Sequence, residues 1–171
     1  MAAQRNRVLV HVFRRDLRVS DQPVLHHLES SADHGFTHFL PLYVFPAHQI
    51  DLRGFLQGGA ETPYPVPRSR VGGYPRCGPH RAKFLAEAVW DLKGSLESLG
   101  SGLLISAGMI DDVVRHVARD LTTNGYKVAA IWMTSHEGTE EKSDESTLAS
   151  VSHDLGAEFK LWHDEKYFID E

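Results

Sequence analysis

The sequence predicts an α/β fold, a doubly wound, five-stranded parallel sheet that is flanked by helices in the Rossmann-like manner. Short apolar runs rich in β-branched residues alternate with longer segments whose apolar residues recur at helical spacing. Strands that alternate with helices pair in parallel, because each helix carries the chain back over the sheet. A length of 171 residues, with 42% hydrophobic and 24% charged residues, fits one domain with its own core.

Two strands and one helix are expected at the start of the chain. Residues 8–13 form a nearly continuous apolar run, which is typical of a strand buried on both faces. Asp21 is the expected N-cap of the following helix, and Gly35 is expected to close it. Residues 36–45 are the second strand, in which Pro41 removes one backbone donor and indicates a position near an edge or a bulge.

The segment 47–79 breaks this pattern, since it holds six of the 14 glycines and five of the eight prolines. A linker between two domains would explain such a composition. Only 46 residues precede it, however, which are too few for an independent core. We therefore expect a single domain over residues 1–171 with a long Pro- and Gly-rich loop at 47–79.

An amphipathic helix is expected from His80 to Leu99, because its apolar residues are spaced by four and three before Gly100. The remaining elements are expected in this order: a strand at 103–105, a helix from Asp111 or Asp112, a strand at 127–133, a helix at 139–153 and a strand at 157–162. Doubly wound sheets bind ligands beyond the carboxyl ends of their strands, so functional residues are sought in the loops that follow them.

Composition excludes several classes of protein. No apolar run is long enough to cross a membrane, and the one near the N-terminus is too short for a signal peptide. The single cysteine excludes a disulfide framework and a multi-cysteine metal site. A net charge of −5 gives no overall basic field toward nucleic acid or anionic membranes. We expect an intracellular protein without a membrane partner, in a compartment that the sequence leaves open.

Common catalytic and nucleotide-binding motifs are missing as well. The turn after the first strand, residues 14–18, contains no glycine that could cradle a pyrophosphate. The phosphate-loop pattern and the Gly-x-Ser-x-Gly elbow do not occur either. None of the eleven histidines has the spacing of a metal motif such as His-Glu-x-x-His. No metal site and no catalytic residue is therefore assigned.

A charged cluster follows the first strand, where a doubly wound sheet binds its ligand. It comprises Arg14, Arg15, Arg18, Asp16 and Asp21. One interpretation is an anion-binding or domain-contact site. The other is an arginine–carboxylate network that pins the loop against neighbouring helices.

Three further loop residues carry functional hypotheses. Glu137 directly follows the strand at 127–133, where its carboxylate could accept two N–H donors from a heterocycle or favour the start of the next helix. Arg76 stands on a turn before the helix at His80, within reach of a carboxylate or an aromatic ring. Cys77, with basic neighbours, is either a reactive thiol or a small packing residue.

Two motifs resemble the photolyase/cryptochrome family. Residues 13–25, beginning Phe-Arg-Arg-Asp-Leu-Arg, resemble its opening signature, and residues 41–45 resemble its next block. Residues 74–92, beginning Tyr-Pro-Arg-Cys-Gly-Pro-His, are similar to the DASH-type cryptochromes in particular. The resemblance runs from Val8 to the end of the chain and implies the N-terminal antenna domain of a light-driven flavoprotein.

The resemblance also implies cofactors and partners. DASH-type proteins use a 5,10-methenyltetrahydrofolate antenna, for which Glu137 matches the glutamate that binds the pterin and Arg76 stands where the family has a lysine. The resemblance further implies a C-terminal helical domain beyond this chain. That domain would be required to bind FAD, to repair DNA as a deoxyribodipyrimidine photolyase and to contact single-stranded or damaged DNA. The chain alone is then expected to be inactive, to bind the folate weakly, and to expose an apolar docking surface through which it could self-associate. Two alternatives are a stand-alone nucleotide-binding domain and a protein-interaction module.

Overall fold

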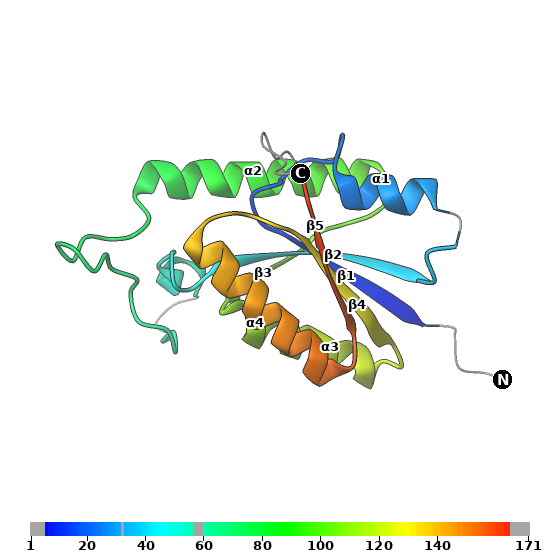
Figure 1. Ribbon diagram of the computed structural model, residues 1–171. Helices are drawn as coiled ribbons and strands as arrows, with labels where there is room; N and C mark the ends of the chain where they lie inside the picture. Colours follow the sequence, from blue (N-terminus) through cyan, green and yellow to red (C-terminus); the bar gives the residue numbers. More distant parts are fainter. Residues whose placement is uncertain (1–5, 32, 57–59, 165–171) are drawn as a thin grey trace, which may run out of the picture.

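The computed structural model describes residues 6–31, 33–56 and 60–164, and it confirms the α/β fold. The strands, all parallel and in the order β3-β2-β1-β4-β5, are β1 (Arg7–Phe13), β2 (His38–Pro46), β3 (Leu104–Gly108), β4 (Lys127–Thr134) and β5 (Glu158–Trp162). The helices are α1 (Pro23–Ser30), α2 (Pro79–Ser98), α3 (Ile110–Thr123) and α4 (Thr139–Leu155), with a short 3-10 helix η1 (Leu52–Phe55). Figure 1 shows α1 and α2 over one face of the sheet and α3 and α4 over the other.

The central strand β1 is buried on both faces, as its apolar run predicts. Val8, Val10 and Val12 pack in one cluster with residues of α3 and α4. Leu9 and Phe13 point to the opposite face, toward the residues of α1 and α2. This two-sided burial fixes β1 in the middle of the sheet, so the loops at its carboxyl end lie at the centre of that edge.

The start and end of α1 differ from the expectation. Asp21 is not the N-cap: it has a left-handed backbone (φ 55), and the side chain of Gln22 accepts the hydrogen bond from Leu25 N at 2.9 Å instead. The helix ends at Ser30, and Gly35 (φ 74) serves the turn before β2 rather than the helix end. The chain reverses at Asp21 to bring the next residue into the core, which moves the cap by one position.

Two strands also differ in detail. Pro41 lies in β2, between β1 and β3, but the pairs with β3 begin only at Leu42. At Pro41 the strand therefore has a neighbour on one side, in agreement with the expected place near an edge. β3 extends to Gly108, beyond the expected end at Ile105, because its last residues pair with the end of β2.

The described parts of the 47–79 loop contain little regular structure apart from η1 and an antiparallel bridge between Arg68 and Pro75. β2, which precedes the loop, pairs with β3, which follows it. Both sides of the loop thus belong to one sheet, and the proposal of a single domain rests on this pairing.

Candidate functional site

The loops after β1 and β4 meet at the carboxyl edge of the sheet. The chain runs from β1 through α1 to β2 on one side, whereas α3 brings it to β4 on the other side. This reversal of strand order opens the crevice in which doubly wound sheets bind ligands. A cavity of about 260 Å³ lies there, lined by Arg15, Asp16, Arg18, Ser135, His136, Glu137 and Asp164.

Glu137 stands at the rim of this cavity. Its side chain is 69% exposed, and its carboxylate lies 3.7 Å from Lys142 Nζ. The N-cap of α4 is Gly138, so Glu137 precedes the cap and is not itself the capping residue. Its position leaves the carboxylate accessible to a ligand that approaches from outside the sheet.

Two acids lie in the first turn of α4, Glu140 and Glu141, and of these Glu141 is buried. Its carboxylate forms an ion pair with Arg15 and covers Gly138 so closely that a Cβ there would overlap it. Burial works to raise the pKa of Glu141, but a hydrogen bond from its own backbone N–H and the charges of Arg15 and Arg14 hold it below its usual value. Glu140 and Glu141 therefore supply the negative charge at the start of the helix, the role that the sequence left open for Glu137.

The arginines of the first loop are paired with carboxylates. Arg14 Nη2 lies 2.6 Å from Asp144 Oδ2, and its Nη1 donates to the carbonyl of Glu141 at 3.2 Å. Arg18 Nε lies 2.8 Å from Asp21, and its Nη2 pairs with Asp164. These contacts agree with the interpretation of a network that pins the loop to α4 and to the end of β5.

Beneath this loop lies a buried network of hydrogen-bonded polar side chains that the sequence did not predict. Asp16 accepts hydrogen bonds from Thr134 Oγ1 at 2.6 Å, from Gln22 Nε2 at 3.0 Å and from Arg14 N at 3.1 Å. Gln22 Nε2 also lies 3.1 Å from His11 Nε2, and His11 Nδ1 lies 3.2 Å from the Trp132 carbonyl. A histidine within an otherwise apolar strand was the one signal in the sequence that could have indicated it.

The network has one consistent proton arrangement. Burial lowers the pKa of His11 to about 4, although Asp16 and the Trp132 carbonyl work to raise it. A neutral His11 donates from Nδ1 to that carbonyl and accepts at Nε2 from Gln22. Burial would raise the pKa of Asp16, but the Thr134 hydroxyl, His11 and Gln22 hold it below its usual value.

Arg76 does not line the cavity of Glu137. It forms an ion pair with Glu140 in the first turn of α4, and its Nη1 contacts the His48 carbonyl at 3.4 Å. Glu140 also accepts a hydrogen bond from Gln49 at 2.7 Å. The two residues assigned to the antenna site thus contact different residues at the start of α4, Glu140 and Lys142, and Arg76 is not among the residues that line the cavity of Glu137.

Neither Cys77 nor the histidines form a recognisable ligand-binding site in the described part of the chain. Cys77 is half-buried against the core beneath α2, as expected for a packing residue. Within the described ranges, His, Cys, Asp and Glu side chains form no group of three or more that could hold a metal ion. Among the described helices, none is both long and apolar enough to cross a membrane.

Comparison with known proteins adds a decisive observation. The family model of DNA photolyase matches residues 9–168, nearly the whole chain. The chain belongs to the DNA photolyase family. A crystal structure of an archaeal photolyase from Sulfolobus tokodaii with two FAD molecules covers 92% of this chain with a TM-score of 0.61. At 21% sequence identity this likeness confirms the photolyase-type fold of the domain.

The curated relatives confirm the resemblance to DASH-type cryptochromes. A putative mitochondrial cryptochrome DASH of Neurospora crassa is 56% identical over 96% of the chain, and a putative cryptochrome DASH of Gibberella zeae is 51% identical over 97%. The cryptochrome DASH of Xenopus laevis is 30% identical over 92% of the chain. The chain spans 22%, 24% and 25% of these three photolyase-family proteins, about a quarter of their length.

Proposed function

We propose that this chain is the N-terminal light-harvesting domain of a DASH-type cryptochrome or photolyase. It contributes one side of a binding site for 5,10-methenyltetrahydrofolate, whose excitation would pass to FAD in the part of the relatives that the chain does not cover. There the flavin would support DNA repair or photoreception. The chain by itself is inactive in this proposal, and its contact with damaged DNA in repair requires the full-length protein.

The observation that carries the proposal is the position of Glu137. It is an exposed carboxylate beyond a central strand, at the rim of a cavity whose other side chains include Arg15 and Arg18. A carboxylate can accept both N–H donors of a pterin edge, and the two arginines of the cavity are already paired with carboxylates. The residues present therefore fit a folate, for which Glu137 would hold the ring.

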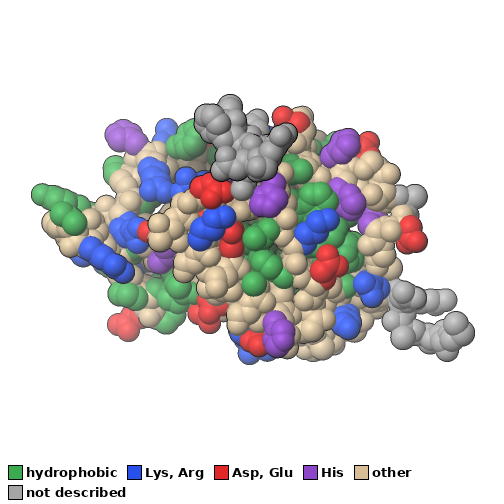
Figure 2. Space-filling view, in the orientation of Figure 1, with side chains coloured by type: hydrophobic (Ala, Val, Ile, Leu, Met, Phe, Trp, Pro, Cys, Tyr) green, Lys and Arg blue, Asp and Glu red, His purple; other side chains and the backbone are tan. Residues whose placement is uncertain are grey.

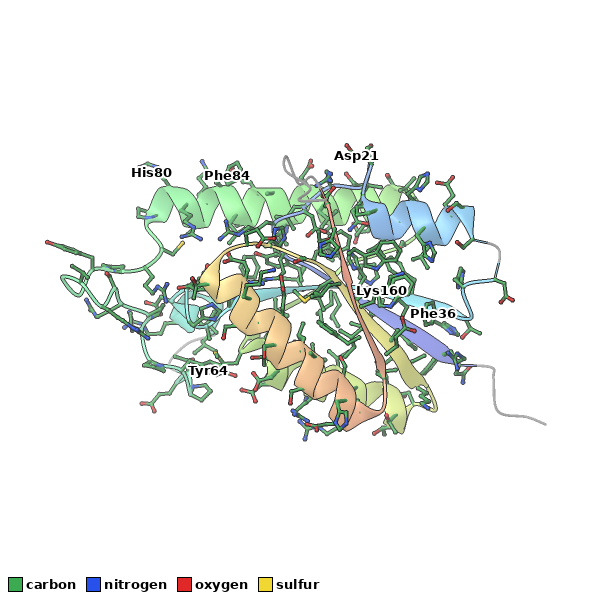
Figure 3. All side chains as sticks on the ribbon, viewed as in Figure 1. Asp21, Phe36, Tyr64, His80, Phe84 and Lys160 are labelled. Carbon is green, nitrogen blue, oxygen red and sulfur yellow. The ribbon has the colours of Figure 1, made fainter. Side chains whose placement is uncertain are left out.

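The cavity volume indicates how the site is completed. At about 260 Å³ it is smaller than the roughly 300–1,000 Å³ of typical ligand sites. A folate would therefore be only partly covered and would bind weakly until another domain closed over it. Phe84 and Trp90 on α2 are 72% and 57% exposed and provide apolar surface for docking or self-association. Figure 3 shows Phe84 on the side of α2 that points away from the sheet.

Arg76 is the second anchor in this proposal. To reach the ligand, its guanidinium would have to exchange Glu140 for the folate, which makes its contribution smaller than that of Glu137. A stand-alone nucleotide-binding function has less support. The second cavity at this edge measures about 80 Å³ and is closed by Arg14, Asp144 and Glu141, so it has no room for a base and ribose.

The test compares methenyltetrahydrofolate binding by the full-length protein with Glu137→Gln and Arg76→Ala variants, using absorbance of the retained folate. Glu137→Gln keeps the shape but replaces one acceptor oxygen by a donor, which leaves a ring N–H unpaired at a cost of roughly 1–3 kcal/mol. We expect weaker binding by about 5- to 150-fold, and a smaller loss for Arg76→Ala. Unchanged retention by Glu137→Gln would show that the site is assigned wrongly.

A further inference from the structure

The helix α1 is too short to cover the strands beneath it. Its eight residues extend about 12 Å, whereas the nine residues of β2 extend about 30 Å. Where the helix ends, a cavity of about 390 Å³ lies between α1, the loop before β2 and the sheet. Its volume falls within the roughly 300–1,000 Å³ of typical ligand sites. The side chains that line it include Leu9, Leu28, Glu29, His34, Phe36 and Phe39.

This cavity lies at the opposite edge of the sheet from Glu137. Phe39 is the second residue of β2, whereas Glu137 follows the end of β4, and the strands are parallel. The amino-terminal edge therefore holds this cavity, and the carboxyl edge holds the folate site proposed above. Figure 3 shows Phe36 below α1, beside the start of β2, and Figure 2 shows histidine and hydrophobic side chains gathered at this end of the molecule.

Aromatic rings form part of the cavity wall. The Phe36 ring contacts the Trp132 ring with 5.2 Å between centroids and the His34 ring with 5.8 Å, and the Phe39 ring stacks on His11 with 6.2 Å. Both phenylalanines are nevertheless only half-buried, so each keeps ring surface for a further contact. Rings that are held in place by their neighbours and open on one side favour stacked or edge-to-face contact with a planar aromatic ligand.

Two polar side chains of the lining restrict the charge of such a ligand. Glu29 is exposed and takes part in no ion pair among the described residues, so its carboxylate repels an anion and accepts from a donor. The backbone N–H of Phe36 donates to His34 Nδ1 at 3.2 Å. A neutral His34 therefore carries its proton on Nε2, where it can donate to a ligand oxygen.

We propose that this cavity binds a neutral, planar aromatic ligand with a hydroxyl or amino group at one edge. The rings of the ligand lie against Phe36 and Phe39, and its polar group donates to the Glu29 carboxylate. An aliphatic ligand of the same size would lose the ring contacts, and a carboxylate would face Glu29. This site is independent of the proposed folate site, because the two lie at opposite edges of the sheet.

The first experiment titrates the ¹⁵N-labelled 171-residue chain with 2-naphthol and follows the amide and indole N–H signals by NMR. We expect a dissociation constant below about 1 mM, with shifts in α1, in the loop before β2 and at the Trp132 indole, which contacts Phe36. Decahydro-2-naphthol has the same skeleton and hydroxyl without aromatic rings, and it should bind about fivefold more weakly. 2-Naphthoate should bind at least about tenfold more weakly, because its carboxylate faces Glu29.

Two substitutions test the assigned contacts. Glu29→Gln should weaken 2-naphthol binding about three- to tenfold and bring 2-naphthoate close to 2-naphthol, because the charged acceptor is lost. Glu87→Gln, which changes an exposed glutamate of α2, is the matched control and should alter neither affinity. Leu28→Trp should fill the cavity and abolish binding, and thermal unfolding followed by circular dichroism checks that each variant is folded.

The same measurements can overturn the proposal. Absence of shifts up to about 2 mM 2-naphthol would show that the cavity takes no such ligand. Shifts centred on residues 135–137 would place the ligand at the carboxyl edge instead. Equal binding of decahydro-2-naphthol would contradict the role of the rings, and unchanged affinity of Glu29→Gln for both naphthalene probes would contradict the role of the carboxylate.

Discussion

Asp16→Asn should destabilise the domain strongly, although it changes a carboxylate into an amide of the same shape. One carboxylate oxygen of Asp16 accepts from Arg14 N, and the other accepts from both Gln22 and Thr134. In either orientation of an asparagine, its NH₂ group would face at least one of these donors. Gln22 cannot rotate its amide to compensate, because its own oxygen caps α1 through Leu25 N.

The magnitude follows from burial. Gln22 and Thr134 are each only 1% exposed, so an asparagine keeps its oxygen toward these two donors and turns its NH₂ group toward Arg14 N, which loses its acceptor. The two remaining hydrogen bonds also lose their charged acceptor. A buried donor left unpaired costs about 1–3 kcal/mol, and hydrogen bonds to a charged group are worth about 1.5–3 kcal/mol. We expect a loss of about 3 kcal/mol in the free energy of unfolding, or a decrease in Tm of about 6–12 °C for a domain of this size.

The assay is thermal and urea unfolding at pH 7, followed by circular dichroism. Asp21→Asn is the matched control, because Asp21 lies in the same loop and its left-handed backbone tolerates asparagine. Its side chain is 74% exposed and forms an ion pair with Arg18. This substitution should cost less than about 1 kcal/mol. If Asp16→Asn lowers Tm no more than this control does, the network does not hold the loop.

The pH dependence gives a second readout for Asp16. Its folded pKa is held below the ordinary value of 3.8, so its contribution to stability is present above that pH and is lost as pH falls through the folded pKa. The difference between the unmodified chain and Asp16→Asn should therefore persist down to about pH 4 and shrink below it. A difference that disappears already at pH 6 would point to another group.

The remaining predictions concern other buried groups and the chain as a whole. Burial lowers the pKa of His11 from 6.5 to about 4, so between these pH values the unfolded chain binds a proton that the folded chain does not. The free energy of unfolding should therefore fall by about 3 kcal/mol from pH 7 to pH 4. His11→Gln should remove this part of the pH dependence in urea unfolding, and an unchanged pH dependence would contradict the assignment. Gly138→Ala should lower the free energy of unfolding by about 1–3 kcal/mol, because the new Cβ would displace the Glu141 carboxylate. Gly94→Ala, in a helix with open space around it, should instead raise the free energy of unfolding by about 0.5–1 kcal/mol. Equal effects of the two substitutions would argue against the close contact at Gly138. The purified chain should unfold in one cooperative transition, bind no flavin and show no photorepair; a flavin spectrum that survives gel filtration would refute this.

The sequence by itself determined the layers and the edge at which the site lies. The apolar run of residues 8–13 is buried on two faces of the sheet, and the apolar spacing from Leu85 to Leu96 gives a helix with one buried face. Leu99, which the same spacing included, is the C-cap and is exposed. Both patterns are local, so they can be read without knowledge of what packs against them. The carboxyl edge, and Glu137 within it, followed from the order of these elements.

The partners of the polar groups were decided only by the tertiary structure. Asp16 meets Thr134 across 118 residues of sequence, and Arg76 meets Glu140 across 64. No local pattern determines such pairs, because a buried donor or carboxylate is matched by whichever complementary group the packing of the helices brings near it. The N-cap moved from Asp21 to Gln22 because the Gln22 amide contacts His11, Asp16 and the start of α1 at once, and only the folded turn between β1 and α1 brings these groups together.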